Sequence, residues 1–217
     1  MWQESFEFLV RPTYLAEDFI LTDTNKLSFQ KICNWPSSWH HSAYPYFLLL
    51  HGDRQCGKTH LSNIWAQKSN AHFLLSHQKD QLEKYPCVVV ENIDSKFCSQ
   101  NDLLYIFNFC HETQKYCLFT SQIFPIQFDL PDLSSRIRSI NEVKITRPDK
   151  ETIKIILVKE FAKKSLNVDP RVVDFLADVI PQNFNSAIDA VEILDKTSLS
   201  TGRHISYALI KQIFLTR

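Results

Sequence analysis

The chain has 217 residues and a mass of 25.4 kDa, enough for one substantial core with a small satellite but too few for several independent domains. Basic and acidic residues both number 24, so the bulk charge gives no sign of electrostatic nucleic-acid binding. The six cysteines form no CxxC pair, and no run reaches about 18 apolar residues, which argues against a disulfide framework, a zinc site and a membrane span. We therefore expect a cytoplasmic protein without a membrane partner.

The first two thirds of the sequence predict a parallel α/β sheet. One short helix is expected at 25–33, and a loop rich in Trp, Pro and Ser follows at 34–45. Helix-length segments at 59–68 and 102–113 then alternate with short apolar runs at 46–51, 72–76, 87–92, 117–121 and 142–146. Such runs are typical of strands that are buried on both faces, which places them in a parallel sheet between helices.

The last third predicts a small helical sub-domain. From Pro148 onward, apolar residues recur at helical spacing in 148–164, 169–180, 185–198 and 206–214. Pro148 and Pro170 suit positions in the first turn of a helix. We therefore divide the chain into an N-terminal segment, 1–12, an α/β domain, 13–147, and a helical sub-domain, 148–217.

A phosphate-binding loop lies between the first strand and the next helix. Residues 52–59 match G-x-x-x-x-G-K-[ST] and follow an expected strand, whereas a plain strand-to-helix turn is the alternative interpretation. Lys58 would reach the β and γ phosphates, and the hydroxyl of Thr59 would bind Mg²⁺. The predicted contacts with ADP or ATP are Gly52, Asp53, Arg54, Gln55, Cys56, Gly57, Lys58, Thr59 and His60.

A second strand carries the acid that such a loop requires. Glu91 ends the apolar run 87–92 and would hold Mg²⁺ directly or through water, unless it merely ends the strand. Asn92 follows at the place where ATPases usually have a carboxylate that orients the attacking water. An amide can position a water molecule but cannot take its proton.

The motifs "GDRQCGKTHLSNIWA", "VVVENID", "CLFTSQIFP", "FDLPDLSSRIRS" and the segment from "RPDKETIK" to "DFLA" resemble the AAA+ proteins of the DnaA family. The likeness is greatest to its short Hda group, the regulatory inactivators of DnaA, and it covers nearly the whole chain. It implies a five-stranded parallel sheet followed by a helical lid, which agrees with the pattern above.

The resemblance assigns three further roles. Gln122 falls at sensor 1, where it would orient water or the γ-phosphate, although a polar residue that ends a strand is the alternative. Arg136 in "LPDLSSR" matches the arginine finger that acts in the nucleotide site of a neighbouring subunit, with a surface ion pair as the alternative and Arg138 as a substitute. Asn185 stands at the sensor 2 position of the lid, where the family has arginine, so weak or absent intrinsic hydrolysis is expected.

The N-terminus resembles the peptide with which Hda-type proteins bind the DNA polymerase III sliding clamp (the beta subunit). Gln3, Phe6 and Phe8 in "QESFEF" have comparable spacing, although Glu4 stands where an apolar residue is usual. Phe6 and Phe8 would enter a clamp pocket, and the Gln3 amide would anchor the peptide. An edge strand or a terminal tail is the alternative.

The resemblance thus favours a nucleotide-bound regulator that, with the DNA-loaded clamp, promotes hydrolysis of DnaA-bound ATP and restrains replication initiation. DnaA and the clamp are the expected partners, DNA would be contacted through the clamp, and self-association stays open. The rival is a helicase-loader-like or DnaA-like ATPase that acts directly on DNA. A stand-alone P-loop kinase is disfavoured, because the sequence shows no second-substrate site.

Overall fold

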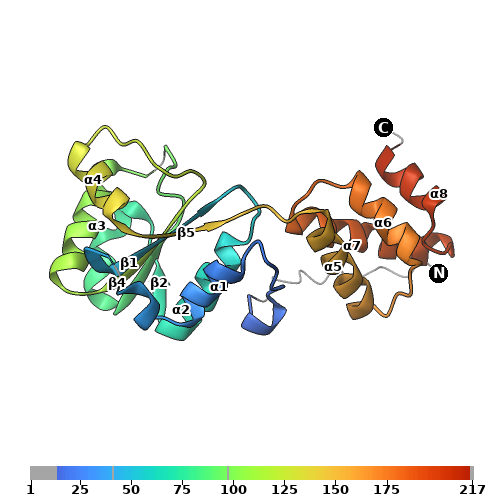
Figure 1. Ribbon diagram of the computed structural model, residues 1–217, viewed down its shortest axis with the longest axis horizontal. Helices are drawn as coiled ribbons and strands as arrows, with labels where there is room; N and C mark the ends of the chain where they lie inside the picture. Colours follow the sequence, from blue (N-terminus) through green and yellow to red (C-terminus); the bar gives the residue numbers. More distant parts are fainter. Residues whose placement is uncertain (1–13, 41, 97, 216–217) are drawn as a thin grey trace, which may run out of the picture.

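The computed structural model describes residues 14–40, 42–96 and 98–215. These residues form two bodies side by side: a sheet covered by helices, and a smaller bundle of helices (Figure 1). A single passage of chain after β5 leads from the first body to the second. Within these ranges no helix combines the length and the hydropathy that crossing a lipid bilayer requires.

The core of the first body is a parallel sheet with strand order β2-β3-β4-β1-β5. The strands are β1 (Tyr44–Gly52), β2 (Ala71–Phe73), β3 (Cys87–Val90), β4 (Tyr116–Ser121) and β5 (Ile140–Ile145). The five-stranded parallel sheet expected from the sequence is confirmed. The second strand is shorter than the expected 72–76, because the chain turns into the 3₁₀ segment η3 (Ser76–Lys84) soon after Leu74 bonds to β3.

Two helical layers cover the sheet. Helices α1 (Lys26–Cys33) and α2 (Lys58–Ser69) pack on one face, and α3 (Gln100–Glu112) and α4 (Pro131–Ser139) pack on the other. Alternate residues of β1 enter opposite layers: Leu48 and Leu50 pack with Trp65 of α2, whereas Phe47 packs with Phe107 of α3. The runs of apolar residues therefore mark strands that are buried on both faces. Two short 3₁₀ helices, η1 (Ala16–Asp18) and η2 (Ser37–Trp39), flank α1.

The second body is the helical lid, which has its own apolar core. It contains α5 (Lys150–Lys163), α6 (Pro170–Val179), α7 (Phe184–Thr201) and α8 (Tyr207–Ile210), followed by the π-helical turn η4 (Lys211–Leu215). Pro170 is the first residue of α6, as expected. The expectation for Pro148 was wrong, because the side chain of Asp149 caps α5 by accepting a hydrogen bond from the Thr152 N–H at 2.8 Å, so the helix begins after it.

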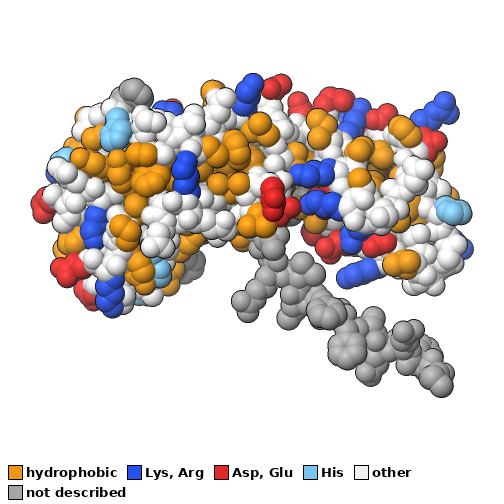
Figure 2. All heavy atoms as spheres, turned by 90° about the horizontal axis from the view of Figure 1, so that it is seen from below, with side chains coloured by type: hydrophobic (Ala, Val, Ile, Leu, Met, Phe, Trp, Pro, Cys, Tyr) orange, Lys and Arg blue, Asp and Glu red, His pale blue; other side chains and the backbone are white. Residues whose placement is uncertain are grey.

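Several charged side chains of the lid pair with one another. Figure 2 shows blue and red side chains interspersed over the lid half of one face, whereas orange side chains gather over the sheet half. Lys154 bridges Glu151 and Asp174, and its hydrogen bond lowers the pKa of the Asp174 carboxyl. Further pairs are Lys150–Asp178, Lys163–Glu160 and Lys164–Asp195. This surface therefore offers little net charge to a nucleic acid.

Residues 14–25, here called the strap, touch both bodies. Phe19 belongs to the apolar cluster beneath α1 and α2, and Ile20 packs against the core of the lid. The strap also meets the chain between β5 and α5, where the Thr146 N–H donates to the Thr24 carbonyl at 3.4 Å. Adjacent residues of one segment thus hold the two bodies together.

Candidate nucleotide-binding site

The loop between β1 and α2 has the backbone shape that encloses an anion. Gly52 ends β1, and a Cβ atom there would lie 2.2 Å from the carbonyl oxygen of Ile145 on β5, which excludes any side chain. Gly57, with φ of 103°, and Gln55, with φ of 60°, adopt left-handed backbone conformations within the loop. The two glycines of the motif are therefore required by close approach at one position and by backbone conformation at the other.

Lys58 opens α2 and is buried, and its ammonium group lies inside the loop. It donates to the carbonyl oxygens of Gly52 at 2.7 Å and Asp53 at 2.8 Å. No side chain caps α2, so the first N–H groups of the helix keep their capacity to bind an anion. An ammonium group, a helix N-terminus and a left-handed loop together form the arrangement that binds phosphate.

Cys56 is buried in the same loop. Burial raises the pKa of its thiol, and the nearby ammonium of Lys58, 3.9 Å from Sγ, opposes that shift. The thiol therefore stays neutral at physiological pH and fills space beneath the loop. Asp53 and Arg54 are exposed, and Asp53 pairs with Arg147, at the start of the passage to the lid, at 2.9 Å.

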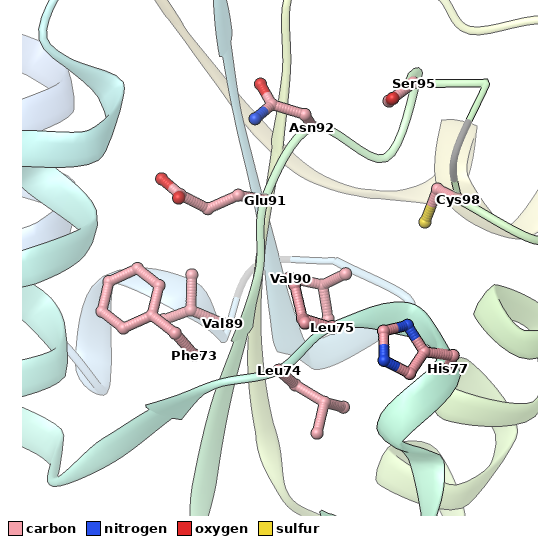
Figure 3. A pocket seen from close by; sticks show the side chains of 10 residues that line it. All are labelled: Phe73, Leu74, Leu75, His77, Val89, Val90, Glu91, Asn92, Ser95 and Cys98. Carbon is pink, nitrogen blue, oxygen red and sulfur yellow. The ribbon is translucent and has the colours of Figure 1, made fainter.

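Glu91 lies at the carboxyl end of β3, on the same face as Val89 and therefore toward α2 (Figure 3). Its Oε1 atom is buried and has no hydrogen-bond partner among the described residues. Thr59, in the first turn of α2, is exposed, and within the same ranges its hydroxyl is unpartnered as well. A carboxylate and a hydroxyl are oxygen donors of the kind that Mg²⁺ prefers, so the residues present fit the ion, which would neutralise phosphate charge.

A cavity of about 310 Å³ opens beside Glu91, over the carboxyl ends of β2 and β3 (Figure 3). Both apolar and polar side chains line it. The lining residues are Phe73, Leu74, Leu75, His77, Val89, Val90, Glu91, Asn92, Ser95 and Cys98. The cavity extends from the predicted magnesium acid away from the phosphate loop, because β4 and β1 lie on the other side of β3.

Asn92 and Gln122 follow neighbouring strands. Asn92 is exposed with φ of 53°, a left-handed conformation that asparagine tolerates better than most residues, and its N–H donates to the Thr120 hydroxyl at 2.9 Å. Gln122 is half-buried at the end of β4, where its N–H donates to Oδ2 of Asp94 at 3.1 Å. The structure thus brings both amide side chains to the carboxyl edge that holds the phosphate loop.

The strap covers the start of α2, a contact that the sequence patterns did not predict. His60 donates through Nε2 to the carbonyl oxygen of Leu15 at 3.0 Å, and its ring packs edge-on against Tyr14 and Phe19, with centroids 5.4 and 5.2 Å away. Phe19 also lies beside Gly57, with a ring carbon 3.8 Å from where a Cβ would stand. The aromatic residues in "RPTYLAEDF" were the available signal, but no spacing rule links them to the loop.

Arg136 lies on α4, far along the chain from the phosphate loop. Its Nε donates to Oδ1 of Asp132, one turn earlier, at 2.9 Å, and its guanidinium lies 5.7 Å from the ring centre of Phe107. This is the surface ion pair given above as the alternative to a finger. Arg138 is exposed two residues on and, in the part of the chain described, has no ion-pair partner.

The remaining predicted residues are placed as follows. Asn185 is exposed in the first turn of α7, and its side chain forms no hydrogen bond with any described residue. Gln3, Phe6 and Phe8 lie outside the described residues. The site that the structure assembles therefore consists of residues 52–60, Glu91, Asn92 and Gln122.

Comparison with known proteins agrees with this architecture. No family model matches the chain. A curated relative, the chromosomal replication initiator protein DnaA of Magnetococcus marinus, is 22% identical over 97% of this chain and 53% of its own length, so the chain spans about half of that relative.

Two solved structures are similar. Domain III of DnaA from Thermotoga maritima superposes with a TM-score of 0.73 and 18% identity over 95% of this chain and 99% of that one. A replication initiator DnaA bound to AMPPCP and single-stranded DNA gives 0.71 and 16%, over 90% and 70%. The chain therefore has the AAA+ fold of the DnaA type.

Proposed function

We propose that this DnaA-like AAA+ chain is a nucleotide-bound regulator of chromosomal replication initiation, of the Hda type. It binds ADP or ATP with Mg²⁺ through residues 52–60, Thr59 and Glu91. With the DNA-loaded sliding clamp it then promotes hydrolysis of ATP that is bound to DnaA, and so restrains initiation. The work takes place in the cytoplasm.

One observation carries this proposal: the phosphate-binding half of the site is complete, whereas two positions that serve hydrolysis carry amides. Lys58 is buried and points into the loop, and Oε1 of Glu91 has no hydrogen-bond partner in the part of the chain that the structure describes. Asn92, however, cannot take a proton from water, and Asn185 brings no positive charge to a γ-phosphate. Such a site retains a nucleotide better than it turns one over.

The segments divide the work. Residues 1–12 bind the clamp through Gln3, Phe6 and Phe8, residues 13–147 hold the nucleotide, and the lid, 148–217, closes over it. Arg136 supplies the positive charge that the partner DnaA site needs in the transition state. To do so it must exchange Asp132 for phosphate, an exchange that costs little because the ion pair lies at the surface.

One comparison favours a second candidate, an ATPase that acts directly on DNA. A similar initiator structure contains both AMPPCP and single-stranded DNA. The two functions differ in where hydrolysis takes place. An ATPase that acts directly on DNA hydrolyses ATP without any partner protein when single-stranded DNA is present. The regulator by itself shows near-background turnover.

The deciding experiment measures the rate at which labelled ATP, prebound to DnaA, is hydrolysed to ADP. The rate is compared with and without this chain, and with and without clamp-loaded DNA. The regulator requires stimulation that depends on both additions. A parallel assay measures turnover by the chain alone with single-stranded DNA. Robust turnover there, with no stimulation of DnaA, would replace the regulator with the direct ATPase.

A further inference from the structure

Asp94 fastens the end of β3 to the end of β4. It lies three residues after Glu91, and its Oδ2 accepts a hydrogen bond from the Gln122 N–H at 3.1 Å. The same two segments are joined at Thr120, whose hydroxyl and carbonyl accept bonds from the N–H groups of Asn92 and Ile93, both at 2.9 Å. The turn after β3 therefore cannot move without moving the Gln122 loop.

The second carboxylate oxygen of Asp94 makes no such bond within the described residues. Oδ1 is buried and has no hydrogen-bond partner among residues 14–40, 42–96 and 98–215, and Oε1 of Glu91 is in the same state. A buried carboxylate oxygen without a donor is costly, and a residue with a purely structural role would have both oxygens satisfied or would be replaced by an apolar one. The cost of keeping this carboxylate points to a role for Asp94 beyond packing, namely through the group that its other oxygen holds.

The sheet order shows which group Asp94 controls. β4 lies between β3, which ends at the magnesium acid, and β1, which leads into the phosphate loop. Gln122 therefore begins between Glu91 and Lys58, and its carboxamide has no hydrogen-bond partner in the described chain. Asp94 holds the Gln122 backbone through the bond to its N–H. The Asp94 carboxylate therefore sets the position from which the Gln122 carboxamide extends.

We propose that Asp94 is a positioning residue, which holds the Gln122 loop so that the Gln122 carboxamide meets the terminal phosphate of a nucleoside triphosphate. Through this contact the chain distinguishes a triphosphate from a diphosphate. The inference rests on the proposed nucleotide binding and deepens it. Asp94 itself does not touch the nucleotide and acts through Gln122.

The test measures dissociation constants for Mg-ADP and Mg-AMPPCP by calorimetry. Wild type should prefer AMPPCP, and Asp94→Ala should reduce that preference about tenfold, the scale of one hydrogen bond to a charged group, with ADP affinity changed by less than about twofold. Asp94→Asn should lose less than about threefold, because its amide oxygen still accepts the Gln122 N–H. This rescue separates positioning from charge.

A double-mutant cycle shows whether Asp94 acts through Gln122. Gln122→Ala should lower the preference as Asp94→Ala does, and the double variant should lose no more than either single variant. Asp169→Ala is the matched control, since it removes a carboxylate-to-backbone bond of 2.8 Å at the start of α6 and should leave the preference unchanged. If Asp94→Ala fails to fold, Gln122→Ala alone still tests the proposal, because an unchanged preference for AMPPCP in that variant would overturn it.

The outcomes separate the two proposals. Wild type that binds neither nucleotide would refute the proposed function itself. Wild type that binds both with equal affinity would overturn only the role of Asp94, as would an unchanged preference in Asp94→Ala or losses that add in the double variant.

Discussion

The ammonium group of Lys58 donates a hydrogen bond to the carbonyl oxygen of Gly52, 2.7 Å away and six residues earlier in the chain. The lysine thus spans the loop that it follows, with its charge held by backbone carbonyls. An arriving phosphate offers the same donor a stronger acceptor. The loop and its lysine are therefore preformed, and binding requires only a local exchange of partners.

Lys58→Ala should weaken binding of Mg-ADP by about a hundredfold, because one charged donor to phosphate is lost while the backbone N–H groups remain. Calorimetry measures the loss directly. Lys68→Ala is the matched control, since Lys68 lies on the same helix and bonds to a backbone carbonyl of Cys33. Equal binding by Lys58→Ala and wild type would show that the loop is not the nucleotide site.

Gly52→Ala should lower the free energy of unfolding by about 3 kcal/mol, because the new Cβ would meet the Ile145 carbonyl of a neighbouring strand. Gly202→Ala is the comparison. Gly202 ends α7 with φ of 65° and open space around it, so only backbone strain of about 1 kcal/mol is expected. Urea denaturation measures both, and a Gly52→Ala protein as stable as Gly202→Ala would contradict the close approach.

Arg136→Ala should abolish stimulated hydrolysis on DnaA-ATP while lowering stability by only about 1 kcal/mol, since the surface ion pair and the contact with Phe107 are both weak. Asp132→Ala tests the tether: it frees the same guanidinium, so stimulation should be retained or should rise. Arg138→Ala should behave as wild type. Loss in Arg138→Ala alone would move the finger by two residues, and full activity of the Arg136/Arg138 double variant would eliminate the trans-acting role.

Gln3→Ala combined with Phe6→Ala should weaken clamp binding at least about tenfold, because a short peptide depends on a few anchors. Ser5→Ala, between the anchors, should bind as wild type does. Surface-immobilised clamp gives the affinities, and nucleotide binding by the double variant provides a check on folding. Undiminished binding by the double variant would locate the clamp contact elsewhere or exclude it.

The sequence predicted the sheet well because strands buried on both faces are largely apolar, as in "CVVV" of β3 and "CLF" within β4. The loop at 52–59 was equally clear from the sequence, because close approach at Gly52 and the left-handed backbone at Gly57 both require glycine. Helix α4 was not predicted: only Leu133 and Ile137 of its nine residues are buried, so its apolar periodicity is weak. Apolar periodicity therefore predicts an element that buries many residues, and it misses a helix such as α4 that contacts the core through two residues.

Tertiary bonds were beyond reach for a different reason. The bond between Asp94 and Gln122 joins two loops that are 28 residues apart, and the contact of His60 with Leu15 spans 45 residues. No periodicity encodes such pairs, because each depends on how two separate strands or helices end. The polar residues of a site can thus be listed from its motifs, whereas the side chains that orient them require coordinates.

Phe19 and Ile20 are consecutive, yet one is packed into the sheet body and the other into the lid. One peptide unit therefore limits how far the sheet body and the lid can separate, so they move apart only when one of these two side chains leaves its cluster. Ile20, half-buried, is the weaker grip. The strap therefore acts as a latch between the sheet body and the lid. We expect a bound nucleotide to dissociate faster when Ile20 leaves the lid core more often.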